Sequence, residues 1–272
     1  MRKVQISLVL ALVFGVTAVS FAVPTLQVGV PNGMGGYVPY TTVLNDEDTA
    51  FTSGNPFTIV VAGVRGQNEN NLSLNLGGQY CEGTTCFNDW AAFGFPVNFN
   101  SHGALLLVSV PESAPDDLSN YNGFTISIDG GSAITAFYFD TANNYFPNNH
   151  YPAQADVSHF LFFDIGSFGS SETVVDFSNN SGNAIGEIKN ITVGITGLSL
   201  DWVHFDVLAL ETDQRGGTGL VTTLANNPGS HDVTWNSDGG GPPQAIPEPA
   251  TMMLVGSGFV GLGWRLRRKT KG

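Results

Sequence analysis

Short runs in which apolar and polar side chains alternate recur along this chain, and they constrain its fold more than any other feature. Phe124, Ile126 and Ile128, for example, alternate with Thr125 and Ser127. A period of two is that of a half-buried β-strand. Long apolar repeats with the helical period of 3.6 residues are absent from the sequence. The chain is therefore predicted to be all-β.

The strand-like runs occupy residues 57–62, 72–76, 104–110, 124–129, 133–139, 160–165, 173–177, 188–195 and 202–210. Asp129-Gly130-Gly131 supplies turn residues between two of them and predicts a hairpin. Strands of this kind, separated by Gly, Asn and Pro turns, predict a β-sandwich of jelly-roll type.

The N-terminus is typical of a secretory signal peptide. Met1-Arg2-Lys3 precedes an apolar run over residues 4–19, and small residues stand at Ser20 and Ala22. This pattern predicts export by the Sec machinery and cleavage between Ala22 and Val23, so that residues 1–22 are a signal peptide. The apolar run is too short and too interrupted to serve as a membrane anchor.

The C-terminus has a different three-part pattern. Pro247-Glu248-Pro249 precedes an apolar, Gly-rich block over residues 252–264, and a basic cluster follows. The cluster consists of Arg265, Arg267, Arg268 and Lys269. A helix over the apolar block would be roughly 20 Å long, shorter than the ~30 Å hydrocarbon core of a bilayer. The basic cluster should stay cytoplasmic, so the segment predicts a transient inner-membrane anchor.

This combination over residues 246–272 resembles the PEP-CTERM sorting signal of Gram-negative bacteria. The resemblance implies processing by an exosortase, a membrane protease, and a final location at the cell surface or outside the cell. It also implies a habitat in which extracellular polysaccharide and biofilm are made. A Gly/Pro linker at 239–245 would expose the cleavage region to the protease. Residues 23–238 remain as one extracellular domain, here called the cargo domain.

The cargo domain is strongly acidic. It contains 22 acidic residues against three basic ones, Arg65, Lys189 and Arg215, which gives a net charge of −19. Such a surface repels nucleic acid and anionic lipid, and nucleic acid is excluded as a partner. The simplest reason for the charge is solubility outside the cell.

Cys81 and Cys86 are the two cysteines, five positions apart on a Gly-containing segment. A structural zinc site needs four ligands, and no second cysteine pair exists. In an oxidising compartment the pair predicts a local disulfide.

Four short segments resemble the choice-of-anchor N proteins, a family that carries PEP-type or alternative anchors. They are residues 23–27, residues 146–152, Val203–Asp206 and Ser230–Asp232. The family has no established activity, so the resemblance implies location and little chemistry.

Five histidines are the first candidates for chemistry: His102, His150, His159, His204 and His231. His204 and Asp206 would share one face of a strand with Trp202, because side chains alternate. Ser230, His231 and Asp232 are neighbours in a predicted loop, but adjacency does not supply the converging geometry of a hydrolase. The spacing of known reactive motifs is absent. We therefore expect structural histidines and no enzyme.

No cofactor is predicted, with calcium as the open alternative. Three groups offer hard oxygen ligands: Asp46, Glu47 and Asp48; Asp140, Asn143 and Asn144; and Asp176, Asn179 and Asn180. Calcium takes six to eight such oxygens, but none of the groups has the EF-hand spacing. Asp and Asn also dominate ordinary turns.

The leading functional expectation is a non-enzymatic structural or glycan-binding protein of the cell surface or extracellular matrix, with extracellular polysaccharide as a partner. Sugars stack on exposed aromatic rings, and four aromatic residues fall in loop-like sequence: Trp90, Trp235, Tyr145 and Tyr151. The alternative from another class is a secreted carbohydrate-active hydrolase, which would need a pair of carboxylates in a cleft.

Overall fold

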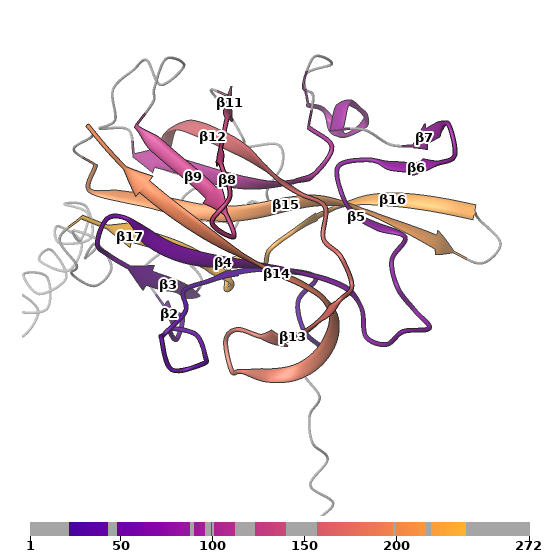
Figure 1. Cartoon of the computed structure of the whole chain (residues 1–272), viewed down its shortest axis with the longest axis horizontal. Helices are drawn as coiled ribbons and strands as arrows, with labels where there is room; N and C mark the ends of the chain where they lie inside the picture. Colours follow the sequence, from indigo (N-terminus) through magenta and orange to yellow (C-terminus); the bar gives the residue numbers. More distant parts are fainter. Residues whose placement is uncertain are drawn as a thin grey trace, which may run out of the picture.

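The computed structural model describes residues 22–42, 48–87, 90–95, 99, 101–111, 123–139, 157–197, 200–215 and 219–237. Within these ranges the chain forms 17 strands and one 3₁₀ turn, η1 (Trp90–Phe93). The all-β prediction is confirmed. Most strands belong to two large sheets (Figure 1).

The smaller sheet has six strands and is antiparallel. Its main path runs β1 (Leu26–Gly29), β4 (Phe57–Gly66), β14 (Ser181–Ile195), β9 (Phe124–Ile128) and β10 (Ala133–Ile134). The sixth strand, β13 (Glu172–Asp176), pairs with the first part of β14.

The larger sheet has nine strands. Its main path runs β11 (Ala136–Phe139), β12 (Val157–Gly166), β8 (Ala104–Pro111), β15 (Trp202–Arg215), β17 (Asp232–Asn236), β3 (Asp48–Thr52) and β2 (Thr41–Thr42). Two further strands, β5 (Asn75–Gly77) and β16 (Gly219–Asn226), pair with the second half of β15. Strands β17 and β3 are parallel, and the other pairs of this sheet are antiparallel.

The main core lies between the two sheets. Ile59 and Val61 of β4 pack in one apolar cluster with Leu106 and Val108 of β8 and with Phe205 of β15. These positions alternate along their strands, as one buried face of a sheet requires. Burying each large aliphatic side chain contributes roughly 1.5–3 kcal/mol. The two sheets therefore form a sandwich around this cluster.

The other face of the larger sheet is also covered over part of its area. Leu105, Leu107 and Leu208 point away from the main core and pack with Phe162 and with Trp90 of η1. Because both faces are buried, β8 has a continuous apolar sequence from Ala104 to Val108. This second face carries polar side chains farther along the same strands, and those side chains form the candidate site.

The predicted hairpin after Asp129 is confirmed only for its first two residues. Strand β10 pairs with β9, but the chain breaks at Thr135, and β11 pairs with β12 in the other sheet. The prediction of one strand over 133–139 is therefore wrong: the two halves belong to different sheets. The sequence shows no turn residue at this crossing.

Several strands had no clear sequence signal: β1, β2, β3, β6 (Tyr80–Glu82), β7 (Thr85–Phe87), β16 and β17. Most are short, and β17 is rich in polar residues that are nevertheless buried. Asp232 begins β17, so its placement in a loop is wrong.

The predicted disulfide between Cys81 and Cys86 is present. The two cysteines face each other across the small hairpin of β6 and β7, which turns at Gly83 with φ of 64°. Glycine reaches this left-handed conformation at little cost. The bond therefore closes a tight local loop.

Candidate functional site

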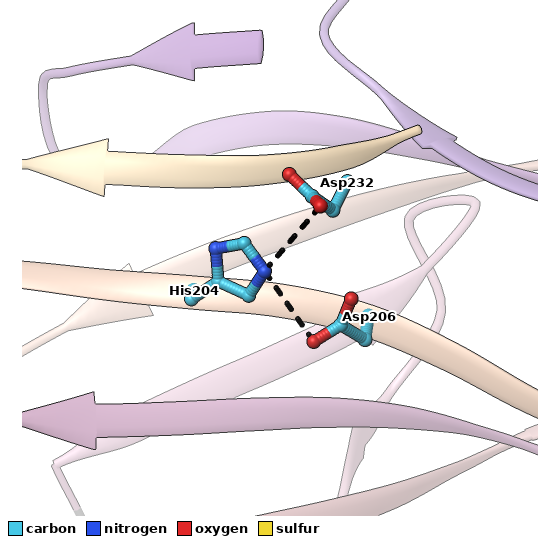
Figure 2. Close-up of side chains that lie close together, drawn as sticks. All are labelled: His204, Asp206 and Asp232. Carbon is cyan, nitrogen blue, oxygen red and sulfur yellow. Dashed lines mark ion pairs between the residues drawn. The ribbon is translucent and has the colours of Figure 1, made fainter. Parts of the chain in front are cut away.

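Three buried side chains meet on the second face of the larger sheet, and Figure 2 shows them. His204 and Asp206 come from β15, and Asp232 comes from the neighbouring β17. His204 is 1% exposed, and both aspartates are fully buried. His204 Nε2 lies 3.4 Å from Asp206 Oδ2 and 3.7 Å from Asp232 Oδ2. These residues are called the histidine–aspartate cluster below.

The register of the strands brings the cluster together. His204 pairs with Thr234 of β17, and Phe205 pairs with Val233, so one step further Asp206 lies opposite Asp232. The sequence correctly predicted that His204 and Asp206 share a face. Their contact with Asp232 depends on the pairing of β15 with β17, which no local sequence pattern predicts.

Polar neighbours hold the cluster in place. His204 Nδ1 lies 2.8 Å from Thr234 Oγ1, which in turn lies 3.2 Å from Thr49 Oγ1 of β3. Asn227 Nδ2 donates to Asp206 Oδ1 at 3.1 Å, while Asn227 Oδ1 accepts from the backbone of Val207. Two cluster residues thus have a fixed partner outside the cluster.

A second histidine joins the two sheets. His231 Nε2 lies 3.0 Å from Asp176 Oδ1, and His231 Nδ1 lies 3.0 Å from Ser230 Oγ. Asp176 ends β13, and His231 immediately precedes β17. The side chains of the sequence neighbours Ser230 and His231 are therefore in contact, and Asp176 completes a chain of hydrogen bonds.

This Ser–His–Asp chain differs from a hydrolase triad in its orientation. In a serine-protease triad the serine faces Nε2 and the aspartate faces Nδ1. Here Ser230 faces Nδ1 and Asp176 faces Nε2. The contact between Ser230 and His231 also lies within one turn of chain. The arrangement acts as a structural link between the sheets.

Asp176 is engaged by protein donors. Ser178 donates to Asp176 Oδ1 through its backbone N–H at 2.8 Å and through its hydroxyl at 2.6 Å. Asn179 Nδ2 donates to Oδ2 at 3.0 Å. Burial opposes ionisation, but hydrogen bonds from Ser178 and His231 outweigh it and hold the pKa of Asp176 below its ordinary value. Asp176 and Asn179 thus belong to a hydrogen-bonded turn, and calcium binding by Asp176, Asn179 and Asn180 stays a prediction.

Tyr40 lies near two buried aspartates, Asp232 and Asp176. Its ring centroid is 5.1 Å from that of His231, and its hydroxyl donates to the backbone carbonyl of Val28. Burial raises the pKa of Tyr40, and the negative charges of Asp232 and Asp176 raise it further. The phenol therefore stays protonated and keeps its hydrogen bond.

A polar cleft of about 470 Å³ lies elsewhere, where β4 and β15 end. It contains two of the three basic residues of the cargo domain, Arg65 and Arg215, and the carboxylates of Glu211 and Asp213. Its further lining residues are Thr25, Val64, Gly66, Gln67, Asn70, Asn71, Leu72, Ser73 and Gln214. No local sequence pattern indicates this cleft, because residues that meet in it, such as Ser73 and Glu211, are 138 positions apart in the chain.

Three side chains of the polar cleft are fixed in place. Arg65 Nη2 donates to the carbonyl of Leu74 at 2.9 Å, and Arg65 also donates to the carbonyl of Ser73. The Ser73 hydroxyl donates to Glu211 Oε1 at 2.6 Å. Arg215 lies 3.8 Å from Asp213 and is largely exposed. The cleft thus combines an ordered floor with exposed polar groups at its rim.

The prediction that four aromatic rings are exposed for stacking against sugars is wrong for two of them, Trp90 and Trp235. Trp90 is 1% exposed and packs in the second apolar cluster, and Trp235 is 7% exposed with its indole N–H donating to Gly54 O at 2.7 Å. Neither ring face is free for a sugar, because both tryptophans fill apolar clusters. Tyr145 and Tyr151 lie outside the described residues.

Other predicted residues also lie outside the described part of the chain. They are residues 1–21 of the signal peptide, Asp46 and Glu47, Asp140, Asn143 and Asn144, His150, the linker 239–245 and the tail 246–272. Of the remaining candidates, Ala22 and Val23 are described, His102 is exposed, and Asp48 begins β3. In the described ranges no helix has the length and apolarity needed to cross a bilayer.

The chain was compared with known proteins. Residues 245–269 match the PEP-CTERM protein-sorting motif. This match confirms the predicted sorting signal and indicates an exported cell-surface protein of a Gram-negative bacterium that is sorted by an exosortase. The resemblance to choice-of-anchor N proteins stays a prediction. No curated protein matched the chain.

One solved structure was similar over most of its length. It is described as "AvmM Catalyzes Macrocyclization in Alchivemycin A Biosynthesis". The identity is 12% and the TM-score 0.31, with 80% of this chain and 98% of that chain covered. A likeness at this level carries no functional argument.

Proposed function

We propose that the cargo domain acts at the cell surface by binding polysaccharide and catalyses no reaction. The sorting motif at 245–269 is the observation that carries the location. Export through the Sec machinery and a transient inner-membrane anchor complete the proposed route. An exosortase-sorted protein then meets the extracellular polysaccharide of its own cell. For the domain itself we propose a jelly-roll-like connection of the two facing sheets.

The polar cleft supports a glycan as the ligand. Its volume of about 470 Å³ lies within the ~300–1,000 Å³ of ordinary ligand sites. Gln67, Asn70, Asn71 and Gln214 offer amide groups, which both donate and accept hydrogen bonds. Sugar hydroxyls need this combination. We therefore propose the polar cleft, and not the buried rings of Trp90 and Trp235, as the glycan site.

Charge narrows the class of polysaccharide. The cargo domain carries −19 overall, so an acidic polymer is repelled over most of its surface. Arg65 and Arg215 reduce this repulsion locally at the polar cleft. Neutral glycans should bind with little dependence on salt, and calcium should strengthen the binding of acidic polymers by bridging carboxylates.

A hydrolase is the second candidate, because Glu211 and Asp213 both line the polar cleft. They stand two residues apart on β15 and so point to one face, with Cα atoms about 6.6 Å apart at ~3.3 Å per residue. Side chains on such neighbouring positions can bring two carboxyl groups to the separation of about 5–9.5 Å that glycosidases use. Glu211 accepts from Ser73, however, and Asp213 lies beside Arg215, which favours structural roles for both.

The test is to incubate the exported protein with neutral and acidic polysaccharides from its own cells, in calcium and in chelator. We expect retention of polymer, with no release of reducing ends. The double variant Asn70→Ala, Gln214→Ala should lose binding on the order of tenfold or more, since each lost hydrogen bond costs about 0.5–1.5 kcal/mol. A matched control, Asn32→Ala, changes an exposed amide outside the cleft.

Two results would contradict the proposal. Release of sugars that disappears in Glu211→Gln or Asp213→Asn would establish the hydrolase. Failure to retain any polymer of the extracellular matrix would leave a purely structural surface protein.

A further inference from the structure

We propose that His204, Asp206 and Asp232 bind one divalent transition-metal cation, for which zinc is the probe. The site is separate from the polar cleft and does not depend on the glycan proposal. The three ligand atoms lie within 4.8 Å of one another, in the interior of the domain.

The distances fit a coordination site better than hydrogen bonds. His204 Nε2 lies 3.4 Å from Asp206 Oδ2 and 3.7 Å from Asp232 Oδ2, beyond the 2.7–3.2 Å of N–H···O bonds. Zinc binds histidine nitrogen and carboxylate oxygen at about 2.0–2.2 Å. Two ligands on a tetrahedron of that size are about 3.3–3.6 Å apart, by geometry from the same bond lengths. The shorter contact falls in this range and the longer one just above it.

A proton held between His204 and the two aspartates explains these distances less well than a cation does. If His204 were protonated and bound to the carboxylates, its charge-assisted hydrogen bonds would be about 2.7–2.9 Å long. Among the described residues, Nε2 of His204 has no hydrogen-bond partner although it is buried. A buried nitrogen of this kind, directed at two carboxylates, is what a cation between them would require (Figure 2).

The second nitrogen of His204 is held as metal-binding histidines usually are. Nδ1 lies 2.8 Å from Thr234 Oγ1, and that hydroxyl lies 3.2 Å from Thr49 Oγ1. A partner on one ring nitrogen fixes the orientation of the ring and leaves the other nitrogen for the metal. Asn227 orients Asp206 in a similar way by donating to its Oδ1, and Asp206 Oδ2 faces His204.

A second, independent observation comes from Ser109 of β8, which pairs with β15 on the side away from β17. It pairs with His204 in the register of β8 and β15, so both side chains lie on the same face of the sheet. Its hydroxyl is fully buried and, within the described chain, makes no hydrogen bond. Burying a hydroxyl without a partner is unfavourable and uncommon, so such a group calls for an explanation. A metal-bound water or the cation itself would supply the partner.

The ligand types select the cation class. Calcium and magnesium prefer all-oxygen sites with six or more ligands, whereas an imidazole nitrogen suits zinc and its neighbours in the first transition row. Two carboxylates also balance the double charge of the cation in a buried position. Because Asp232 comes from β17 and the other ligands from β15, the cation would link these strands.

The experiment uses the exported protein, stripped with chelator, dialysed and titrated separately with zinc, manganese and calcium chloride. Calorimetry should give one zinc per chain and much weaker calcium binding, and zinc should raise the unfolding midpoint. Cobalt substitution should give visible d–d bands without a thiolate band, because the ligands are nitrogen and oxygen.

Variants assign the site. Asp232→Asn should abolish the rise in unfolding midpoint, and Thr234→Val, which keeps the side-chain shape, should weaken zinc binding about 10–100-fold. Asp176→Asn changes another buried aspartate that contacts a histidine, and His102→Gln changes an exposed histidine. Both controls should bind zinc as the wild type does.

Three outcomes would overturn the proposal: no stoichiometric zinc on the wild type, tighter binding of calcium than of zinc, or unchanged binding in Thr234→Val. If Asp232→Asn does not fold, the cobalt spectrum and the Thr234→Val affinity decide.

Discussion

His231 Nε2 lies 3.0 Å from Asp176 Oδ1, and this contact joins the six-stranded sheet to the nine-stranded one. Asp176 is the last residue of the edge strand β13, whereas His231 immediately precedes β17. Near it, Val28 N–H donates to the carbonyl of His231, which adds a backbone link between the same two sheets. The polar contacts at this end of the sandwich therefore fix how the sheets lie on each other.

Acid should weaken this link. The pKa of Asp176 is held below its ordinary value, because hydrogen bonds from Ser178 and His231 outweigh the effect of burial. A lowered folded-state pKa contributes stability that is complete above the unfolded value, near 3.9, and is lost as the pH falls through the folded value. We expect the free energy of unfolding to decline below about pH 4.

The variant Asp176→Asn tests this relation. It should be less stable at pH 7 by on the order of 1–3 kcal/mol, since it weakens a charged acceptor of several hydrogen bonds. Its acid decline should be shallower than that of the wild type, because the titrating group is gone. Urea unfolding between pH 3 and 7 measures both effects, with Asp213→Asn as a more exposed control. Parallel pH profiles for wild type and Asp176→Asn would contradict the assignment.

The Cys81–Cys86 disulfide should stabilise the domain only modestly. It closes a short loop on a hairpin that pairs with neither large sheet. A short loop removes little entropy from the unfolded chain, so the double variant Cys81→Ser, Cys86→Ser should lose on the order of 2 kcal/mol or less. Urea unfolding of the oxidised protein and the variant gives the difference. A variant that cannot fold would show that the hairpin has a larger role.

Some strands could be predicted from the sequence and others could not, for a physical reason. Strands β4 and β8 are continuous apolar runs, and burial on both faces requires that pattern. Strand β17 is equally buried but contains Asp232, Thr234 and Asn236, so its sequence resembles a loop. Thr234 is compatible with burial because His204 of β15 and Thr49 of β3 face its hydroxyl.

The candidate site, like the strands, could be predicted from the sequence only in part. The shared face of His204 and Asp206 follows from the strand period alone. Asp232 joins them through the register of β15 with β17, and Asp176 reaches His231 from 55 residues away. Such contacts are set by the packing of the whole sandwich, and a single sequence does not report them.

The mature N-terminus should be Val23. This residue is 5% exposed and packs in an apolar cluster with Val60, Ala62 and Phe177. Cleavage between Ala22 and Val23 would leave the new terminus next to this cluster, and β1 begins three residues later. N-terminal sequencing of the exported protein should give Val-Pro-Thr-Leu. A mature protein that retains Met1 would exclude cleavage by signal peptidase.

Sorting should depend on the exosortase and on the Pro247-Glu248-Pro249 motif. The matched motif spans residues 245–269 and so includes the proline motif, the apolar block and the whole basic cluster. The apolar block alone is shorter than a bilayer, so it should hold the protein in the membrane only until it is cut. Deleting the exosortase should leave a larger precursor in the membrane fraction, detected by immunoblotting. Replacing the three motif residues with alanine should give the same precursor in a wild-type cell, whereas Lys271→Ala, beyond the motif, should be processed normally. If the protein keeps its size and location in both the deletion strain and the motif variant, processing does not depend on the exosortase.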